Sequence, residues 1–169
     1  VLEQSIEMLE GTPQSWPMAF VYNKGWHQGV IGIVAGKLKE RYNLPAFVMS
    51  IEDDEVKGSA RSIPGVDLGA LIIAAKEKGV LTKGGGHTMA AGFSLTEAQI
   101  PAFRTFAGEY IARSLNNTRP HPVINIDLSL SLPAANAGLC SELERLKPFG
   151  TGNPEPLLLL RGVYFQRPC

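Results

Sequence analysis

The segment Gly84-Gly85-Gly86-His87-Thr88-Met89-Ala90-Ala91-Gly92 contains three consecutive glycines followed by a histidine. Glycine loses more conformational entropy on folding than any other residue, so three in a row indicate a place that requires them. We predict a turn at Gly84, Gly85 and Gly86 in which bare backbone N–H groups form a concavity for an anion, phosphate above all. His87 would add a hydrogen-bond donor or a proton-transfer group at its rim. The alternative on these residues alone is a flexible turn with an incidental histidine.

Two further glycine-rich segments, 25–32 and 58–62, resemble the first in composition. Each contains side chains that can donate a hydrogen bond to phosphate, namely His27, Ser59 and Arg61. Arginine can bind phosphate through two parallel N–H bonds, and a serine hydroxyl can add one more. If the three segments converge in the fold, they form a phosphate pocket.

Several of these residues also have purely structural interpretations. Trp26 is expected to pack in the core rather than to stack on a base, and its neighbour His27 can begin the following helix. Arg61 can pair with an acid such as Asp67. The acidic turn over 52–55 is interpreted as a solvated loop rather than as a set of metal ligands.

Composition and charge limit the classes of function. The chain has 169 residues, 44% of them hydrophobic, and a formal net charge of zero. This suits one medium domain, or one domain and a fragment, and does not indicate broad nucleic-acid binding through net charge. The two cysteines, Cys140 and Cys169, form neither a metal motif nor a disulfide framework. No signal peptide or membrane-spanning run is recognisable, which favours a cytoplasmic protein.

The residues that hydrolytic chemistry needs are not grouped in this sequence. Two-metal phosphoester hydrolysis requires several carboxylates and histidines around a metal pair, and no such cluster is recognisable. A Ser-His-Asp set with supporting context and a P-loop are also missing. We therefore expect no metal site in this chain, and no metal-dependent hydrolysis by this chain alone.

Hydrophobic periodicity predicts an α/β fold for the first two thirds of the chain. The expected elements are strands over 17–22 and 46–51 with a helix over 30–38 between them, a hairpin arm over 56–62, a helix over 68–78, and a short strand over 93–95. Asp67 is placed to cap the helix over 68–78, and Gly79 to end it. Thr96 and Gln99 form a capping-box pattern before a further amphipathic helix.

Residues 116–122 have the composition of a linker. Beyond them, alternating apolar residues predict a strand over 124–130, leucine spacing predicts a helix over 139–146, and an irregular loop over 148–156 precedes a strand over 157–165. The first ten residues are typical of a helix already under way, and the last run is strand-like. We therefore expect a piece of a longer protein.

Residues 84–92 resemble the glycine-histidine signature of the DHH-associated domain in the DHH phosphoesterase superfamily. Small-oligonucleotide phosphodiesterases share that signature. Residues 25–35, 57–62 and 148–156 resemble the corresponding segments of the RecJ single-strand-specific exonucleases, with Ala60 where a glycine is common. The resemblance covers nearly the whole chain.

This resemblance implies a domain organisation. Residues 1–16 would be the end of an interdomain linker helix, and 17–115 a DHH-associated, substrate-binding domain with a central mixed sheet flanked by helices. Residues 116–122 would be the linker, and 123–169 a partial OB-fold-like β segment. The catalytic DHH domain would lie upstream, outside this chain.

The resemblance also implies a function. The whole protein would hydrolyse single-stranded DNA from its 5′ end, as a cytoplasmic monomer in DNA repair and recombination, with Mn2+ or Mg2+ held by the missing domain. His87 would act in catalysis, and the phosphate-binding residues would be Ser59, Arg61, Gly84, Gly85, Gly86, His87, His27 and Gly29. The alternatives are a DHH-family phosphodiesterase for short oligonucleotides or cyclic dinucleotides, which typically lacks the 148–156 segment, and a non-catalytic nucleic-acid-binding module.

Overall fold

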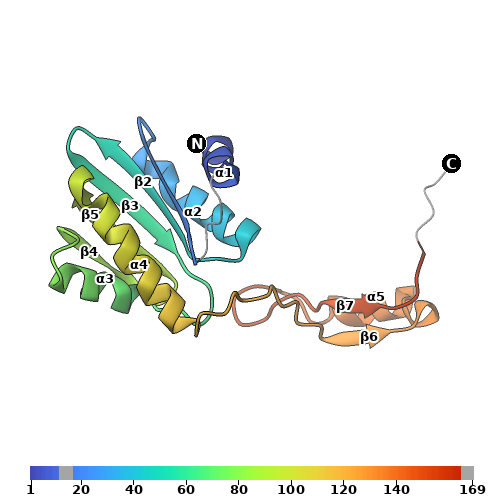
Figure 1. Cartoon of the computed structure of the whole chain (residues 1–169). Helices are drawn as coiled ribbons and strands as arrows, with labels where there is room; N and C mark the ends of the chain where they lie inside the picture. Colours follow the sequence, from blue (N-terminus) through green and yellow to red (C-terminus); the bar gives the residue numbers. More distant parts are fainter. Residues whose placement is uncertain (12–16, 165–169) are drawn as a thin grey trace. The chain divides into compact units, whose positions relative to one another are not determined.

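The computed structural model describes residues 1–11 and 17–164. The chain divides into two compact units, Val1–His121 and Pro122–Cys169 (Figure 1). Each unit is described by itself below.

The first unit is built on a five-stranded mixed sheet, which confirms the predicted α/β class. Its elements are α1 (Leu2–Glu10), β1 (Ala19–Lys24), α2 (Gln28–Tyr42), β2 (Ala46–Glu52), β3 (Glu55–Arg61), α3 (Leu68–Glu77), β4 (Lys83–His87), β5 (Ala90–Thr96), the 3-10 turn η1 (Glu97–Gln99) and α4 (Ile100–Ser114). The strand order is β1-β2-β3-β5-β4. β1 and β2 are parallel, and the other pairs are antiparallel.

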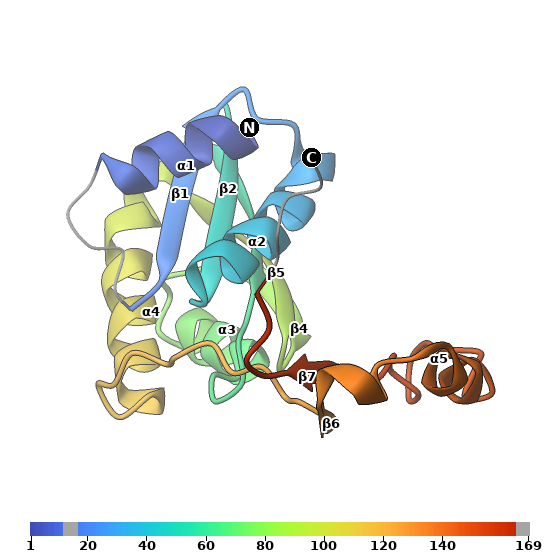
Figure 2. The ribbon, with the colours of Figure 1, turned by 90° about the vertical axis from the view of Figure 1, so that its right-hand side faces the viewer.

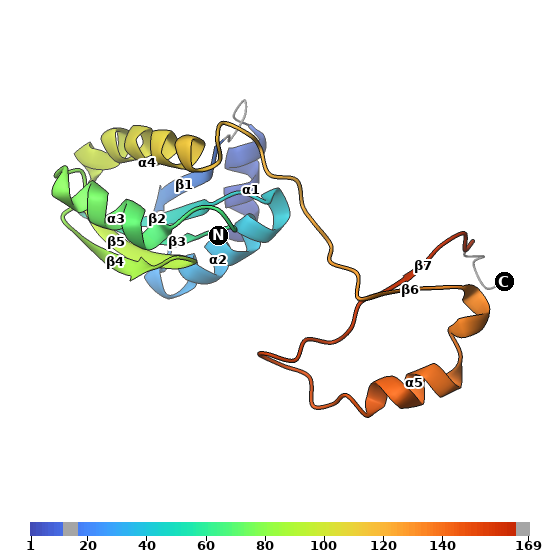
Figure 3. The same cartoon turned by 90° about the horizontal axis from the view of Figure 1, so that it is seen from below.

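Helices lie on both sides of this sheet (Figures 2 and 3). On the α3 and α4 side, a cluster of phenylalanine rings forms the larger core, and the Phe93 and Phe103 centroids lie 4.9 Å apart. On the other side, α1 and α2 pack on β1 and β2 around Trp26, which is 3% exposed. The indole Nε1 donates to Gln4 Oε1 of α1 at 2.9 Å. The prediction that Trp26 packs in the core is therefore confirmed.

Predicted signals at the helix ends are present in the structure. The side chain of Asp67 accepts a hydrogen bond from Ala70 N at 3.0 Å and caps α3, and Gly79 follows that helix with a φ of +72°. Thr96 and Gln99 form the capping box before α4. On the other side of the sheet, Arg41 of α2 donates a hydrogen bond to Glu10 of α1, and this bond raises the pKa of the Arg41 guanidinium.

The prediction of a turn over 84–87 was wrong, because these residues form the edge strand β4. The turn is made by Thr88 and Met89, and β5 then begins at Ala90 instead of at Phe93. Glycine adopts extended backbone as readily as a turn. Pairing with β5 and packing against α3 favour the extended form. The prediction failed because these contacts are made with residues that are distant in sequence, and the local sequence pattern does not reveal them.

The second unit contains β6 (Leu128–Leu130), η2 (Leu132–Ala134), α5 (Ala137–Glu144) and β7 (Leu158–Leu160), with β6 and β7 parallel. Both strands are shorter than the predicted 124–130 and 157–165, and Phe165 lies outside the described residues. Across 122–164, the structure shows no side chain that is buried. Without an apolar face to cover, alternation alone does not extend a strand.

The loop over 148–156 is irregular but ordered, as predicted. The Asn153 side chain donates to the carbonyl oxygens of Leu146 and Pro148 at 2.8 and 2.9 Å. The backbones of Gly150 and Asn153 also pair across the loop. These contacts hold the segment without a regular element.

Candidate nucleic-acid interface

Alternate residues of β3, β5 and β4 point to the side of the sheet opposite α3 and α4. The cross-strand register aligns them in three rows, which we call the open face: Arg61–Ala90–His87, Ser59–Gly92–Gly85 and Lys57–Ser94–Lys83. On this side α2 packs on β1, β2 and β3. In the described part of the chain, no helix covers β4 and β5 there (Figure 3). The result is a polar surface with three lysine or arginine side chains and one histidine.

Two of the three consecutive glycines are required by close packing, one against α3 and one against the neighbouring strand β5. A Cβ added to Gly84 would lie 2.7 Å from Ile72 Cγ2 of α3. A Cβ added to Gly86 would lie 2.6 Å from Ala91 Cα and would also clash with the Ala90 carbonyl oxygen. These two glycines therefore have a structural explanation.

The middle glycine has no such explanation. A Cβ added to Gly85 would meet no atom within 4 Å, and one added to its cross-strand partner Gly92 would reach only the Gly58 oxygen, at 4.0 Å. Both residues are exposed. Gly85 and Gly92 thus leave a bare strip of backbone on the open face, which a ligand can approach closely.

Arg61 is the strongest anion-binding group on this face. Its Nη1 donates to Ser59 Oγ at 3.2 Å and to the Ala60 oxygen at 2.9 Å. Within residues 1–11 and 17–164 the guanidinium has no carboxylate partner, so the alternative of a pair with Asp67 was wrong. A Cβ on Gly32 of α2 would lie 3.2 Å from both Arg61 Nη2 and Ser59 Oγ. This glycine therefore lets α2 form a close wall beside them.

The His87 ring is oriented by its own turn. Its Nδ1 accepts a hydrogen bond from Met89 N at 3.3 Å, which leaves Nε2 as the group that can meet a ligand. The turn is anchored to α3, because Leu68 N donates to the Thr88 oxygen at 3.1 Å and Thr88 Oγ1 donates to Asp67 Oδ2 at 3.3 Å. We call Asp67 and Thr88 the turn anchor.

His27 is the N-cap of α2, where its Nδ1 accepts a hydrogen bond from Gly29 N at 3.0 Å. The structural interpretation of this residue is therefore observed. Gln28 Nε2 donates to Glu52 Oε2 at 2.8 Å, so α2 begins beside the β2–β3 turn. His27 and Gly29 consequently lie toward the Lys57 end of β3, whereas Arg61 lies at the other end.

The structure thus groups Ser59, Arg61, Gly85 and His87, and places His27 and Gly29 farther along α2. Sequence reasoning did not identify the pairing of Gly92 with Gly85, the row of two lysines or the turn anchor. One signal for the rows was available, because Lys57, Ser59 and Arg61 alternate and must share one face of a strand. The cross-strand partners depend on register, which the sequence pattern does not show.

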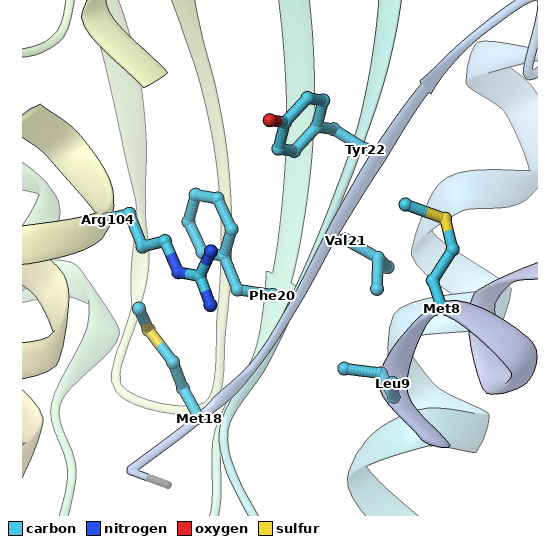
Figure 4. Close-up of a pocket in the computed structure, with 7 residues that line it drawn as sticks. All are labelled: Met8, Leu9, Met18, Phe20, Val21, Tyr22 and Arg104. Carbon is cyan, nitrogen blue, oxygen red and sulfur yellow. The ribbon is translucent and has the colours of Figure 1, made fainter. Parts of the chain in front are cut away.

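A cavity of about 230 Å3 lies at the opposite edge of the sheet, between α1, β1 and α4 (Figure 4). Its lining is mainly apolar and contains one cation: Met8, Leu9, Met18, Phe20, Val21, Tyr22 and Arg104. The Arg104 guanidinium lies 5.8 Å from the centroid of the Phe20 ring. None of the predicted phosphate-binding residues lines this cavity, so it is separate from the open face.

Metal ligands are not grouped in the described residues. No set of three or more histidine, cysteine, aspartate or glutamate side chains there could hold a metal ion. The residues present therefore do not fit the Mn2+ or Mg2+ that the resemblance implies for the whole protein. Within the same residues, no helix has both the length and the apolar character needed to cross a bilayer.

Comparison with known families gives the class of this fold. Residues 16–113 match the DHHA1 domain, and residues 126–168 match the RecJ OB domain. The chain belongs to the DHHA1 domain family. Within that family it is homologous to the RecJ single-stranded-DNA-specific exonucleases, as the similarity to their DHHA1 and OB regions predicted.

Individual relatives support this assignment. The chain is 33% identical to the single-stranded-DNA-specific exonuclease RecJ of Bacillus subtilis over 97% of its length, and it spans only 21% of that protein. Crystal structures of Thermus thermophilus RecJ with Mn2+ and with Mg2+ match with TM-scores of 0.74 and 0.73, at 33% and 32% identity. These matches cover 94% and 92% of this chain and 24% of each RecJ chain.

Proposed function

We propose that this chain is the substrate-binding part of a RecJ-type exonuclease that hydrolyses single-stranded DNA from the 5′ end. The proposal is supported by homology to RecJ over nearly the whole chain and by the phosphate-binding chemistry of the open face. In this proposal residues 17–115 bind substrate, 116–122 link, and 123–169 belong to an OB fold. The protein acts as a cytoplasmic monomer with single-stranded DNA as its partner, in DNA repair and recombination.

The observation that carries the proposal is the position of Arg61. Its guanidinium has no acidic partner in the described residues and lies one row from the bare backbone of Gly85 and Gly92. The unpaired guanidinium suits an anionic ligand, and the bare backbone beside it leaves space for a bulky one. A sugar-phosphate chain has both properties. An arginine that formed an ion pair with a carboxylate on a helix surface would not offer a free charge beside bare backbone.

Four residues of the first two rows have a role in this proposal. Arg61 and Ser59 donate to the oxygens of one phosphate, and His87 donates from Nε2 on the other side of Ala90. Donors fixed before the reaction stabilise negative charge that develops on phosphate oxygens during cleavage. Gly85 admits the chain between them. In this proposal Mn2+ or Mg2+ is held by a part of the protein outside this chain, and the described residues contain no cluster of three or more possible metal ligands.

The test is the Arg61→Ala variant of the intact enzyme with 5′-phosphorylated single-stranded DNA. We expect kcat/KM to fall by about 100-fold or more, the effect typical of one preorganised donor to a developing charge. Lys76→Ala is the matched control, because it removes one positive charge from α3 on the other side of the sheet. An unchanged rate in Arg61→Ala would reject the role of this face.

Two other functions are compatible with a DHHA1 domain. A phosphodiesterase for short oligonucleotides or cyclic dinucleotides is disfavoured by the RecJ OB match over 126–168. A non-catalytic binding module would bind single strands without cleaving them. The proposed enzyme differs from both alternatives in what the intact protein should cleave. It should cleave long single-stranded DNA in the presence of metal and should cleave duplex DNA little.

A further inference from the structure

The third row of the open face, Lys57–Ser94–Lys83, has no role in the function proposed above. We propose that it is a second phosphate subsite, which binds the same DNA strand several nucleotides from the phosphate at Arg61 and His87. This inference rests on the proposed function. It adds that a strand must exceed a minimum length before it can occupy both phosphate subsites. Its ligand is a phosphodiester of a single strand.

The two outer rows have the same cross-strand arrangement. In each row two side chains that can donate hydrogen bonds, one from β3 and one from β4, flank a small residue of β5: Arg61 and His87 flank Ala90 in the first row, and Lys57 and Lys83 flank Ser94 in the third. Strands lie about 4.8 Å apart, so the Cα atoms of Lys57 and Lys83 are about 10 Å apart. Two long side chains at that separation can reach one phosphate between them.

The distance between the rows sets the spacing of the phosphates. The outer rows are four residues apart along each strand, for example Ala90 and Ser94 on β5. At about 3.3 Å per residue this is about 13 Å. One nucleotide of a stacked strand advances by about 3.4 Å, so the rows must contact phosphates that are not adjacent. The bare backbone of Gly85 and Gly92 lies midway and leaves room for the intervening chain.

The charges of the third row are available to a ligand. Lys83 forms no ion pair within the described ranges 1–11 and 17–164. Lys57 Nζ lies 3.6 Å from Glu55, but the two side chains are 42% and 56% exposed. Exposed pairs of this kind contribute little, so phosphate can compete for the ammonium. The Glu55 carboxylate belongs to the next row and would repel a further phosphate, which ends the cationic track at Lys57.

Binding to oligonucleotides of increasing length tests the inference on the 169-residue chain. The probes are 5′-phosphorylated oligothymidylates from the dinucleotide to the decanucleotide, followed by NMR titration at low salt. We expect Lys57→Ala/Lys83→Ala to bind the dinucleotide like the unsubstituted chain, and to bind the decanucleotide at least about fivefold more weakly. The plot of log affinity against log salt concentration for the decanucleotide has a negative slope. Its magnitude should become smaller by about 0.7 for each lost phosphate contact.

Two further variants make the outcomes distinct. Lys76→Ala/Lys78→Ala removes two charges from the α3 side and should change neither affinity nor slope. Arg61→Ala should weaken binding of every length. If Arg61→Ala has that effect while the third-row variant binds all lengths normally, the second subsite is rejected and the proposed function stands. If no oligonucleotide binds, or Arg61→Ala has no effect, both are rejected.

Discussion

At the scale of single residues, the three consecutive glycines of β4 differ in what surrounds them. Gly84 and Gly86 face α3 and β5 at distances that exclude a methyl group, whereas Gly85 faces open space. None of the three glycines has a positive φ, so alanine can adopt the backbone angles found at each of these positions. Replacing each glycine in turn by alanine can therefore distinguish an effect on packing from an effect on ligand access.

We predict opposite results for two of these alanine substitutions. Gly84→Ala should lower the free energy of unfolding by about 1–3 kcal/mol, because the added methyl overlaps Ile72. Gly85→Ala should leave stability equal or slightly higher, because alanine restricts the unfolded chain more than glycine does. Gly85→Ala should nevertheless weaken oligonucleotide binding, since its methyl stands on the open face. Urea unfolding and NMR titration measure the two effects.

The comparison between these variants supplies its own controls. Gly86→Ala should behave like Gly84→Ala, because its methyl would overlap the backbone of Ala90 and Ala91. A loss of stability in Gly85→Ala as large as in Gly84→Ala, or normal binding by Gly85→Ala, would contradict this division of roles.

Residue types could be predicted from the sequence, but their surroundings could not. Ser59, Arg61 and His87 could be predicted as candidate hydrogen-bond donors to phosphate, because the donor chemistry of a side chain is local. That Arg61 lacks an acidic partner depends on where Asp67 is used, and that residue caps α3 and binds Thr88 instead. The assignment of only Gly85 to the open face depends on which side of β4 meets Ile72.

At the scale of elements, the open face depends on how the β4–β5 turn is held. The turn anchor, Asp67 and Thr88, joins it to the first turn of α3. Ser62 N also donates to the Met89 oxygen at 2.9 Å. The position of His87 is therefore coupled to the start of a helix on the other side of the sheet.

We predict that Asp67→Ala impairs both stability and binding. Loss of the N-cap should cost about 1 kcal/mol, and the freed turn should let the His87 ring move. Amide hydrogen exchange at Leu68 and Met89 should accelerate, and oligonucleotide affinity should fall. Thr96→Ala is the control, since it removes a side chain of the capping box at the end of β5 without touching the turn. Equal affinities in the two variants would show that the turn anchor does not position His87.

Most elements could be predicted from local patterns, since caps and helical periodicity are encoded within a few residues. The starts of α3 and α4 are examples. β4 could not, because glycine carries no side chain whose period reveals a strand. β6 and β7 were predicted too long, because alternation indicates a strand only where one face is covered.

At the scale of the whole molecule, the buried residues all belong to the first unit among the residues that the structure describes. The leucines of β7 are no more than half-buried. Folding stability should therefore come from residues 1–121, and residues 122–169 should contribute little to it in this chain.

We predict that deleting residues 122–169 changes the midpoint of thermal unfolding by less than about 4 °C, which corresponds to under about 1 kcal/mol. In the full chain, amides over 122–164 should exchange with solvent much faster than those of β2 and β3, where buried residues such as Phe47 and Val56 lie. Strong protection over 122–164, or a large shift on deletion, would show that the second unit has a stable core.

β4 is the last strand of its sheet, and its outer backbone groups face away from β5. Such an edge is a template on which another chain can add a strand, which is a common route to aggregation. Three glycines offer an incoming strand no side chains to pair with, and a lysine at the start of β4 opposes close approach. Among the described residues no strand pairs with the outer side of β4, and the composition that would admit the proposed DNA strand thus also disfavours strand addition by a second copy of the chain.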